Sequence, residues 1–192
     1  MKIAIASSGL GHVARGIETW ACDTAVALSQ WTVDSGQLTV GKENHVEVTL
    51  FSAVALSTTV HRPLSTIVLP CLKRGDRWVQ FLTRIMPGFS WRWGWKSAYD
   101  IEQRSFWQHL WPILRDENFD ILHVQDPLLA DLCRRYRKAG KLRTKEILAH
   151  GTEEPLEFLE KFDYVQHLAP WHLEQTVQKL EEKRGFTTDL RN

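Results

Sequence analysis

The chain has 192 residues, of which 43% are hydrophobic and 24% charged, and its formal net charge is +1. This composition excludes wholesale disorder, and the near-neutral charge argues against a chain built mainly to bind nucleic acid. No apolar run approaches the length of a membrane span, and a strand-like run follows Met1 directly, so we expect no signal peptide and a cytoplasmic location.

Length, cysteine count and histidine spacing each limit what the chain can be. The length suits a single core, so we expect residues 1–192 to form one domain. The three cysteines, Cys22, Cys71 and Cys133, are far apart and odd in number, which favours buried reduced thiols over a disulfide framework. The eight histidines show no zinc-like spacing with one another or with cysteine, so we predict no metal site.

The first stretch of the chain is the one around which we expect the rest to be organised. The apolar run Ile3 to Ala6 predicts a buried central strand, and apolar residues at helical spacing beyond Gly16 predict a helix. Gly9, Gly11 and Gly16 permit positive φ and a close approach of the backbone to a ligand, while the first turn of a helix offers unpaired N–H groups. We therefore predict an anion site, above all for a phosphate, at this turn.

The spacing of these glycines leaves one alternative. It reads G-x-G-x-x-x-x-G, which differs from the dinucleotide fingerprint G-x-G-x-x-G and lacks the Lys-Ser/Thr pair of a P-loop. The second predicted strand ends in Leu50-Phe51-Ser52, without the acidic residue that holds the ribose of NAD. Classical NAD binding is therefore disfavoured. The alternative to a phosphate site is that the glycines only form a tight strand-to-helix turn.

Strands and helices alternate along the rest of the chain. Strand patterns cover residues 46–51, 65–69, 119–124, 146–149 and 163–169, and helical patterns cover 81–86, 100–115, 128–139 and 170–183. The polar stretch 30–44 is interpreted as a loop, and Gly140 as the end of a helix. This order predicts an α/β fold with a doubly wound, mainly parallel Rossmann-like sheet and helices on both faces.

In such a fold, ligands bind at the carboxyl ends of the strands. The residues that directly follow predicted strands are Ser8 to His12, Ser52, Gln125-Asp126 and His150-Gly151. We expect them to line one crevice although they lie far apart in sequence. His123 lies inside its predicted strand, and we expect a core residue there.

One segment in the middle of the chain interleaves aromatic and basic residues, Phe89-Ser-Trp-Arg-Trp-Gly-Trp-Lys. Such a segment suits contact with a membrane interface or a sugar, because Trp rings carry an apolar face and a polar edge. The alternative is that Trp91, Trp93 and Trp95 cover the core at an irregular joint, the commoner place for large aromatic residues.

Five short motifs follow one another along nearly the whole chain. They are Gly9-x-Gly11 with Arg15-Gly-Ile-Glu-Thr-Trp, Lys42-Glu-Asn-His-Val-Glu-Val-Thr-Leu-Phe, Phe119-Asp-Ile-Leu-His-Val-Gln-Asp-Pro, Ile147-Leu-Ala-His-Gly and Phe162-Asp-Tyr-Val-Gln-His-Leu-Ala-Pro. In this order they resemble the glycine loop, helix start and strand ends of the N-terminal half of retaining GT-B glycosyltransferases of family 4, which include sucrose, glycogen and lipid-glycan transferases. Each motif alone is weak, and the shared order carries the resemblance.

The resemblance implies roles for the glycine turn and for two strand ends. In the family the glycine loop lies against the diphosphate of a nucleotide-sugar donor, which assigns donor-diphosphate binding to Gly9, Leu10 and Gly11. A histidine late in the fourth-strand motif often contacts a sugar, and Gln125 takes its place here, whereas His150 matches the histidine that ends the fifth strand. We therefore assign the catalytic positions to Gln125 and His150. The alternative for His150 is a structural hydrogen bond to a loop carbonyl.

The resemblance also implies contacts and partners. We assign acceptor or sugar contact to His12, Gly16, Asp126 and Gly151. In the family a second Rossmann-like domain holds the nucleotide and most of the residues that neutralise the leaving diphosphate, so we expect this chain to be the acceptor-side domain and a C-terminal GT-B domain to act in cis or in trans. The expected ligands are a nucleotide-sugar donor, which is a substrate and not a cofactor, and a glycan, lipid or small-molecule acceptor. We expect no nucleic acid, and peripheral contact with the inner membrane face as the only membrane interaction.

Two rival functions come from other classes. One is a non-catalytic binding or scaffolding module of the same fold. The other is a nucleotide-dependent oxidoreductase or epimerase, which the missing ribose acid disfavours. Titration with NAD against a nucleotide-diphosphate sugar separates the oxidoreductase from the transferase.

Overall fold

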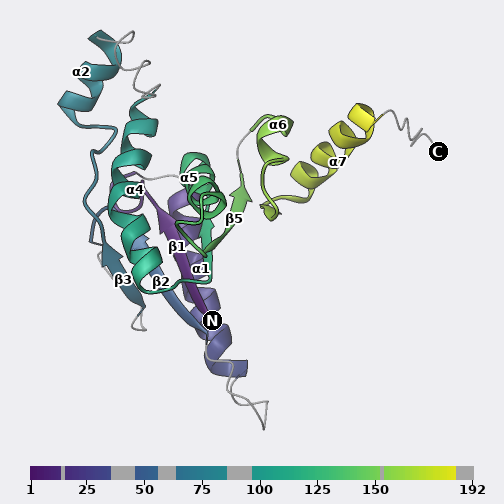
Figure 1. The fold of residues 1–192 in the computed structure, drawn as a ribbon, viewed down its shortest axis with the longest axis horizontal. Helices are drawn as coiled ribbons and strands as arrows, with labels where there is room; N and C mark the ends of the chain where they lie inside the picture. The colour runs from purple at the N-terminus through teal and green to yellow at the C-terminus, as the bar shows by residue number, and fades with distance from the viewer. Residues whose placement is uncertain (14–15, 36–45, 56–63, 86–96, 152–153, 185–192) are drawn as a thin grey trace.

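The computed structural model describes residues 1–13, 16–35, 46–55, 64–85, 97–151 and 154–184. Its strands form one six-stranded sheet in the order β3-β2-β1-β4-β5-β6, and every neighbouring pair is parallel (Figure 1). The predicted fold class, an α/β fold with a doubly wound parallel sheet, is therefore confirmed.

The predicted strands are all present. They are β1 (Lys2–Ser7), β2 (Glu47–Ser52), β3 (Ser65–Val68), β4 (Ile121–Val124), β5 (Lys145–His150) and β6 (Val165–His167). The bounds differ most at β6, where only the middle of the predicted stretch 163–169 pairs with β5.

The helices agree with the predicted ones less closely at their ends. They are α1 (Gly16–Ser35), α2 (Arg77–Ile85), α4 (Ala98–Asp116), α5 (Pro127–Lys138), α6 (Leu156–Leu159) and α7 (Pro170–Arg184). α1 continues to Ser35, through the start of the stretch interpreted as a loop, and α2 begins at Arg77 rather than at Phe81. The sequence pattern misses α6, because four residues are too few to show a helical period.

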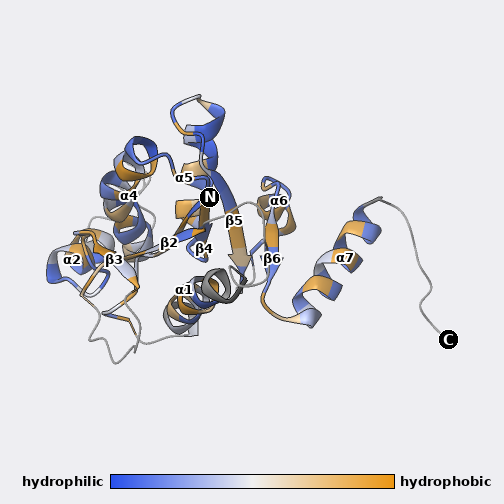
Figure 2. Ribbon diagram, turned by 90° about the horizontal axis from the view of Figure 1, so that it is seen from below, coloured by the Kyte–Doolittle hydropathy of each residue, from blue (hydrophilic) through white to orange (hydrophobic). Residues whose placement is uncertain are grey.

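The sheet lies between two helical layers. α4 and α5 cover one face, and α1 covers the other (Figure 2). The side chains of β1 alternate between these layers, because successive residues of a strand point to opposite faces. Ala4 and Ala6 pack in the core under α4 and α5, whereas Ile3 and Ile5 pack in the core under α1.

The helix α4 carries the apolar stripe that its spacing predicts. Phe106, Leu110 and Leu114 are all fully buried. The helix begins with a capping box, in which the Asp100 backbone N–H donates to Ser97 Oγ and the Ser97 backbone N–H donates to Asp100 Oδ2, both at 3.1 Å. This cap and this stripe fix α4 across the sheet and thereby place the residues at its first turns, which lie near the ends of β1 and β4.

The burial of the three cysteines agrees only in part with the prediction. All three cysteines are free, and Cys133 is buried, but Cys22 and Cys71 are partly exposed, so the expectation that all three are buried is wrong for these two. Cys71 lies near the start of the connection from β3 to α2, and its side chain is therefore only partly covered by the protein. Burial, with a smaller effect of the nearby Glu102 carboxylate, still raises the pKa of Cys71 to about 11.

The last helix lies at one end of the fold. α7 follows the edge strand β6, contacts β6 and α6, and extends away from the sheet (Figures 1 and 2). None of the helices that the structure describes is both long and apolar enough to pass through a bilayer. The aromatic segment at 89–96 lies outside the described residues, so its two interpretations stay predictions.

Candidate functional site

The strand order creates a switch point between β1 and β4. From β1 the chain builds β2 and β3 on one side, and it then returns to build β4, β5 and β6 on the other. The loops that follow β1 and β4 therefore diverge at their carboxyl ends, where open α/β sheets bind ligands. Ala6 pairs with Val124, so the next residues of the two segments, Ser7 and Gln125, come together at this edge. We call Ser7 to His12 with Gln125 and Asp126 the switch-point site.

The glycine turn after β1 is a compact backbone loop. The Leu10 N–H donates to the Ser7 carbonyl at 3.4 Å, and the His12 and Val13 N–H groups donate to the Gly9 carbonyl at 3.2 and 3.0 Å. The Leu10 side chain is buried in the core under α1. Leu10 therefore anchors the turn with its side chain, and any contact with a donor diphosphate falls to the backbone.

Gly11 has a structural reason to be glycine. Its φ is +90°, which L side chains rarely adopt. A Cβ at this position would lie 2.9 Å from Val54 Cβ and 3.1 Å from the Val54 carbonyl oxygen, just after β2. The close approach that the sequence predicts toward a ligand is therefore made, at Gly11, toward the protein itself.

A buried carboxylate ties the glycine turn to two other segments. Glu102, in the first turns of α4, is 0% exposed. Ser8 Oγ donates to its Oε1 at 3.2 Å, and His12 Nε2 lies 3.0 Å from its Oε2. Arg74, from the connection between β3 and α2, donates its backbone N–H at 2.8 Å and its Nε at 3.1 Å to the same carboxylate. One acid thus joins the turn, α4 and the β3–α2 connection.

A second buried acid holds the same turn from β4. Asp126 is 1% exposed, and its Oδ2 accepts the Ser8 N–H at 2.7 Å. The hydroxyl of Tyr99 in α4 donates to its Oδ1, and the Arg74 guanidinium lies over the Tyr99 ring, 4.3 Å from its centroid. Both carboxylate oxygens are thus engaged by the protein. The structure gives Asp126, predicted as a sugar contact, the role of positioning the turn.

The two acids differ in protonation behaviour. Burial acts to raise the pKa of Glu102, but hydrogen bonds from Arg74 and His12 outweigh it, and the pKa is lowered. Burial raises the pKa of Asp126, and the hydrogen bonds from Tyr99 and Ser8 offset this only in part. Glu102 is therefore the ionised partner of Arg74, while Asp126 has a stronger tendency to hold a proton.

The helix that follows β4, α5, is capped by a side chain of α4. Oε1 of Gln103 in α4 accepts the backbone N–H of Leu128 at 2.9 Å and of Leu129 at 3.3 Å. These are N–H groups of the first turn of α5, the kind that would otherwise attract an anion. The start of α5 is therefore less open to an anion, and the phosphate site predicted at the turn after β1 stays a prediction.

Several buried polar groups at the switch point have no hydrogen-bond partner in the part of the chain that the structure describes. Gln125 is 5% exposed, and neither its Oε1 nor its Nε2 makes a hydrogen bond to any residue that the structure describes. The same is true of Ser7 Oγ and of His12 Nδ1. A buried polar group without a partner costs about 1–3 kcal/mol. Because such groups normally bind something, the switch-point site offers donors and acceptors to a ligand.

His150, the other predicted catalytic residue, belongs to a different cluster. It is buried at the end of β5, with Nδ1 3.3 Å from Nδ1 of His167 at the end of β6. Its ring centroid lies 5.2 Å from that of His172, at the start of α7. The single crevice expected from the sequence therefore divides into the switch-point site and an imidazole cluster made by His150, His167 and His172.

The remaining residues predicted to contact a ligand or to line the crevice are Gly16, Gly151 and Ser52. Gly16 is the exposed first residue of α1, and an added Cβ would meet nothing within 4 Å. Gly151 follows His150, and an added Cβ would lie 2.9 Å from Cδ1 of Leu168, a side chain that can move. Ser52 donates its hydroxyl to the Val54 carbonyl at 2.9 Å. None of these contacts requires a ligand.

Sequence reasoning misses Glu102, Arg74 and Tyr99. A signal for Glu102 exists, because it lies four residues before Phe106 on the stripe of α4 that the spacing predicts to be buried. A carboxylate on a buried helix face needs a cationic or hydrogen-bonding partner. No pattern in the local sequence around Arg74 predicts that it pairs with Glu102.

The comparisons with known proteins leave the chain without an assigned family. No protein-family model matches the sequence, and no curated protein matches it. In the part of the chain that the structure describes, no group of three or more His, Cys, Asp or Glu side chains is placed to hold a metal ion. The switch-point geometry and the sequence motifs are therefore what support a function.

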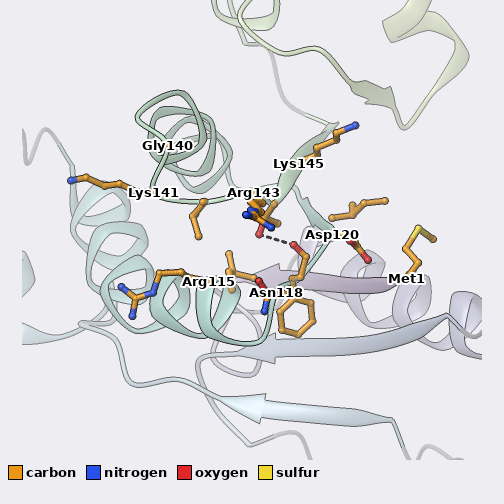
Figure 3. A pocket seen from close by; sticks show the side chains of 13 residues that line it. Met1, Arg115, Asn118, Asp120, Gly140, Lys141, Arg143 and Lys145 are labelled. Atoms are coloured by element: carbon orange, nitrogen blue, oxygen red, sulfur yellow. Dashed lines mark hydrogen bonds between the residues drawn. The ribbon is translucent and has the colours of Figure 1, made fainter.

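The opposite edge of the sheet holds a separate hollow. It has a volume of about 1000 Å³ and is lined by residues near the ends of α4 and α5 and the starts of β4 and β5 (Figure 3). Arg115, Lys141, Arg143 and Lys145 surround it, and Asp120 is the acid among its lining residues. The Asp120 carboxylate accepts the Lys2 backbone N–H at 2.7 Å.

Proposed function

We propose that this chain is the acceptor-side domain of a retaining glycosyltransferase of the GT-B type, which moves a sugar from a nucleotide-sugar donor to a glycan, lipid or small-molecule acceptor. The observation that carries the proposal is the buried amide of Gln125, which makes no hydrogen bond to any described residue and lies beside the glycine turn, at the switch point of a Rossmann-like sheet. The family resemblance of the motifs adds to it.

The chemistry of these groups suits a hydroxylated, diphosphate-bearing ligand. A carboxamide can donate and accept at once, which is what a sugar hydroxyl requires. The compact turn after β1 presents backbone toward the same edge, where an anion can approach N–H groups without meeting a large side chain. Gln125 would orient the sugar, and the backbone N–H groups of the turn would contact the diphosphate.

The acids of the site favour a binding role over proton transfer. Glu102 is paired with Arg74, and both oxygens of Asp126 are engaged by Ser8 and Tyr99. Neither is therefore available as a general base. This fits a retaining transfer in which the leaving phosphate takes the acceptor proton. It equally favours the second candidate function, a non-catalytic binding module of the same fold.

The test is a titration of the whole chain with UDP-glucose, GDP-mannose and NAD⁺, followed by amide NMR. We expect a nucleotide sugar to shift the Gly9 and Gly11 amides and the side-chain amide of Gln125. Gln125→Ala should lose these shifts, whereas Gln178→Ala, which removes an exposed amide on α7 that donates to Glu182, should keep them. Shifts caused by NAD⁺ alone would favour an oxidoreductase, and an absence of shifts with every ligand would refute the proposal.

Transfer separates the two remaining candidates. A glycosyltransferase domain should give sugar transfer or slow donor hydrolysis when a C-terminal GT-B domain is supplied with it. A binding module should bind the sugar nucleotide with the same residues and leave it intact. Donor consumption measured by release of the nucleoside diphosphate distinguishes these outcomes.

A further inference from the structure

A second cavity lies at the same edge of the sheet, one strand beyond the switch-point site. It has a volume of about 310 Å³ and is enclosed by the end of β5, by α6 and by α7. This volume is at the lower end of the range for small-molecule sites. No residue of the switch-point site lines it, so an inference about this cavity does not depend on the function proposed above.

The residues of α7 that line this cavity are polar, whereas its apolar residues lie elsewhere on the helix. The lining residues His172, Gln175 and Lys179 recur at intervals of three and four along α7, so they form one stripe of that helix. A helix normally turns its apolar stripe toward the protein. Here the apolar Leu173 and Val177 are exposed, while the residues of α7 that border the cavity are polar. The pattern favours a polar ligand between α7 and the body of the domain.

His172 is the most informative of these residues. It is 9% exposed, and its Nδ1 has no hydrogen-bond partner among the described residues. Its backbone is fixed, because its N–H donates to the Ala169 carbonyl at 3.1 Å and its carbonyl accepts Thr176 Oγ1 at 2.8 Å. The Trp171 ring lies against the imidazole, 3.6 Å between centroids. A rigid, buried imidazole with an unused nitrogen is a built hydrogen-bonding position.

The other lining groups define the ligand. Lys179 has no ion pair with any described residue and supplies a positive charge to the cavity that His172 also lines. Glu154 and Gln175 supply acceptors, and the Gln175 amide also supplies donors. Leu159 gives an apolar wall. Together these groups match a small molecule that carries one anionic group, several hydroxyls and an apolar C–H face.

We propose that the cavity between β5, α6 and α7 binds a small hydroxylated anion of the sugar-phosphate class. Lys179 and His172 would hold the anionic group, and Glu154 and Gln175 would bind hydroxyls. His150 also lines the cavity, and the 3.3 Å contact between its Nδ1 and Nδ1 of His167 helps to hold its imidazole in place.

The experiment measures the binding of three probes to the whole chain by calorimetry: glucose 6-phosphate, glucose and inorganic phosphate. We expect glucose 6-phosphate to bind roughly tenfold or more tightly than either of the other two, because only it engages both sets of groups. Equal binding of inorganic phosphate would refute the hydroxyl contacts, and equal binding of glucose would refute the anion contacts. No binding of glucose 6-phosphate would overturn the proposal.

Matched variants locate the binding. His172→Gln and Lys179→Gln should each weaken glucose 6-phosphate binding roughly tenfold, as expected for the loss of one charge-assisted hydrogen bond. His109→Gln on α4 and Lys138→Gln on α5 change exposed residues outside the cavity and should leave binding unchanged. If His172→Gln fails to fold, the exposed Lys179 still tests the site. Unchanged binding in the folded Lys179→Gln variant would place the ligand elsewhere.

Discussion

The two edges of the sheet treat charge in opposite ways. At the carboxyl edge, Glu102 and Asp126 are buried and hydrogen-bonded to three different segments. At the amino edge, Arg143 and Lys145 surround an open hollow, are exposed and have no ion pair with any described residue (Figure 3). The difference teaches that the buried acids at the carboxyl edge hold a turn in place, while the cations around the hollow at the amino edge stay exposed to solvent.

Helix direction contributes to this difference. α4 and α5 both end near the amino edge, where the negative ends of their dipoles favour cations such as Arg115 and Lys141. At the carboxyl edge the chain must instead hold a turn with positive φ against two strands. Holding this turn requires directional hydrogen bonds, and the acids that accept them, Glu102 and Asp126, are buried beside the turn. Substitutions should consequently be costly at the carboxyl edge and mild at the amino edge.

The largest expected effect is at Glu102. Glu102→Gln leaves the partly buried Arg74 guanidinium without its countercharge and should lower the free energy of unfolding by about 3–5 kcal/mol. The matched change at the amino edge is Asp116→Asn, which removes an exposed carboxylate 2.7 Å from Arg115 and should leave stability unchanged. Urea unfolding of both variants measures the contrast. Equal losses would show that the two edges do not differ.

The next largest expected effect is the loss of stability when a glycine with positive φ is replaced, and two glycines separate the steric part of this loss from the backbone strain. Gly11 and Gly140 both have positive φ, but a Cβ would clash with Val54 only at Gly11 and would meet nothing within 4 Å at Gly140. Gly11→Val should therefore be about 2 kcal/mol more destabilising than Gly140→Val, which carries the backbone strain alone. Denaturant midpoints of the two variants give the difference. Similar midpoints would mean that Val54 moves aside.

The smallest effect concerns pH. Burial lowers the pKa of His123, and the hydrogen bond with Gln166 offsets this only in part. As the pH falls below the ordinary histidine value of about 6.5, the unfolded chain binds a proton that the folded chain resists, so stability falls with pH.

His123→Gln should therefore show a shallower loss of stability than the parent between neutral pH and about pH 5. Unfolding free energies measured across that range test it. A slope as steep as that of the parent would assign the pH dependence to other groups.

The sequence was enough for the fold because its signals are local. The run Ile3 to Ala6 and the stripe of α4 each define an element by their own periodicity, and the alternation of strands with helices implies the parallel sheet. The misses have equally local causes. α6 is too short to show a period, and α1 continues through polar residues because helix propensity does not require an apolar face at every turn.

The site could be predicted only in part. Gln125 could be predicted to lie beside the glycine turn, because residues that follow parallel strands meet at the carboxyl edge of the sheet whatever their side chains are. The pairing of Glu102 with Arg74, and of Asp126 with Ser8 and Tyr99, joins residues from separate segments, and side chains that meet only after folding leave no spacing in the sequence. The same reason separates His150 from Gln125, because β6 and α7 supply the partners of His150.

The shortness of the two outermost strands has a consequence for behaviour at high concentration. β3 has four residues and β6 has three, so each leaves few unpaired backbone groups along its free side. A long, flat, open strand invites another chain to add to the sheet and is a common start of fibrous aggregation. With such short outer strands, the sheet is a poor template for intermolecular strand addition, and contacts between molecules of this protein should be made through side chains.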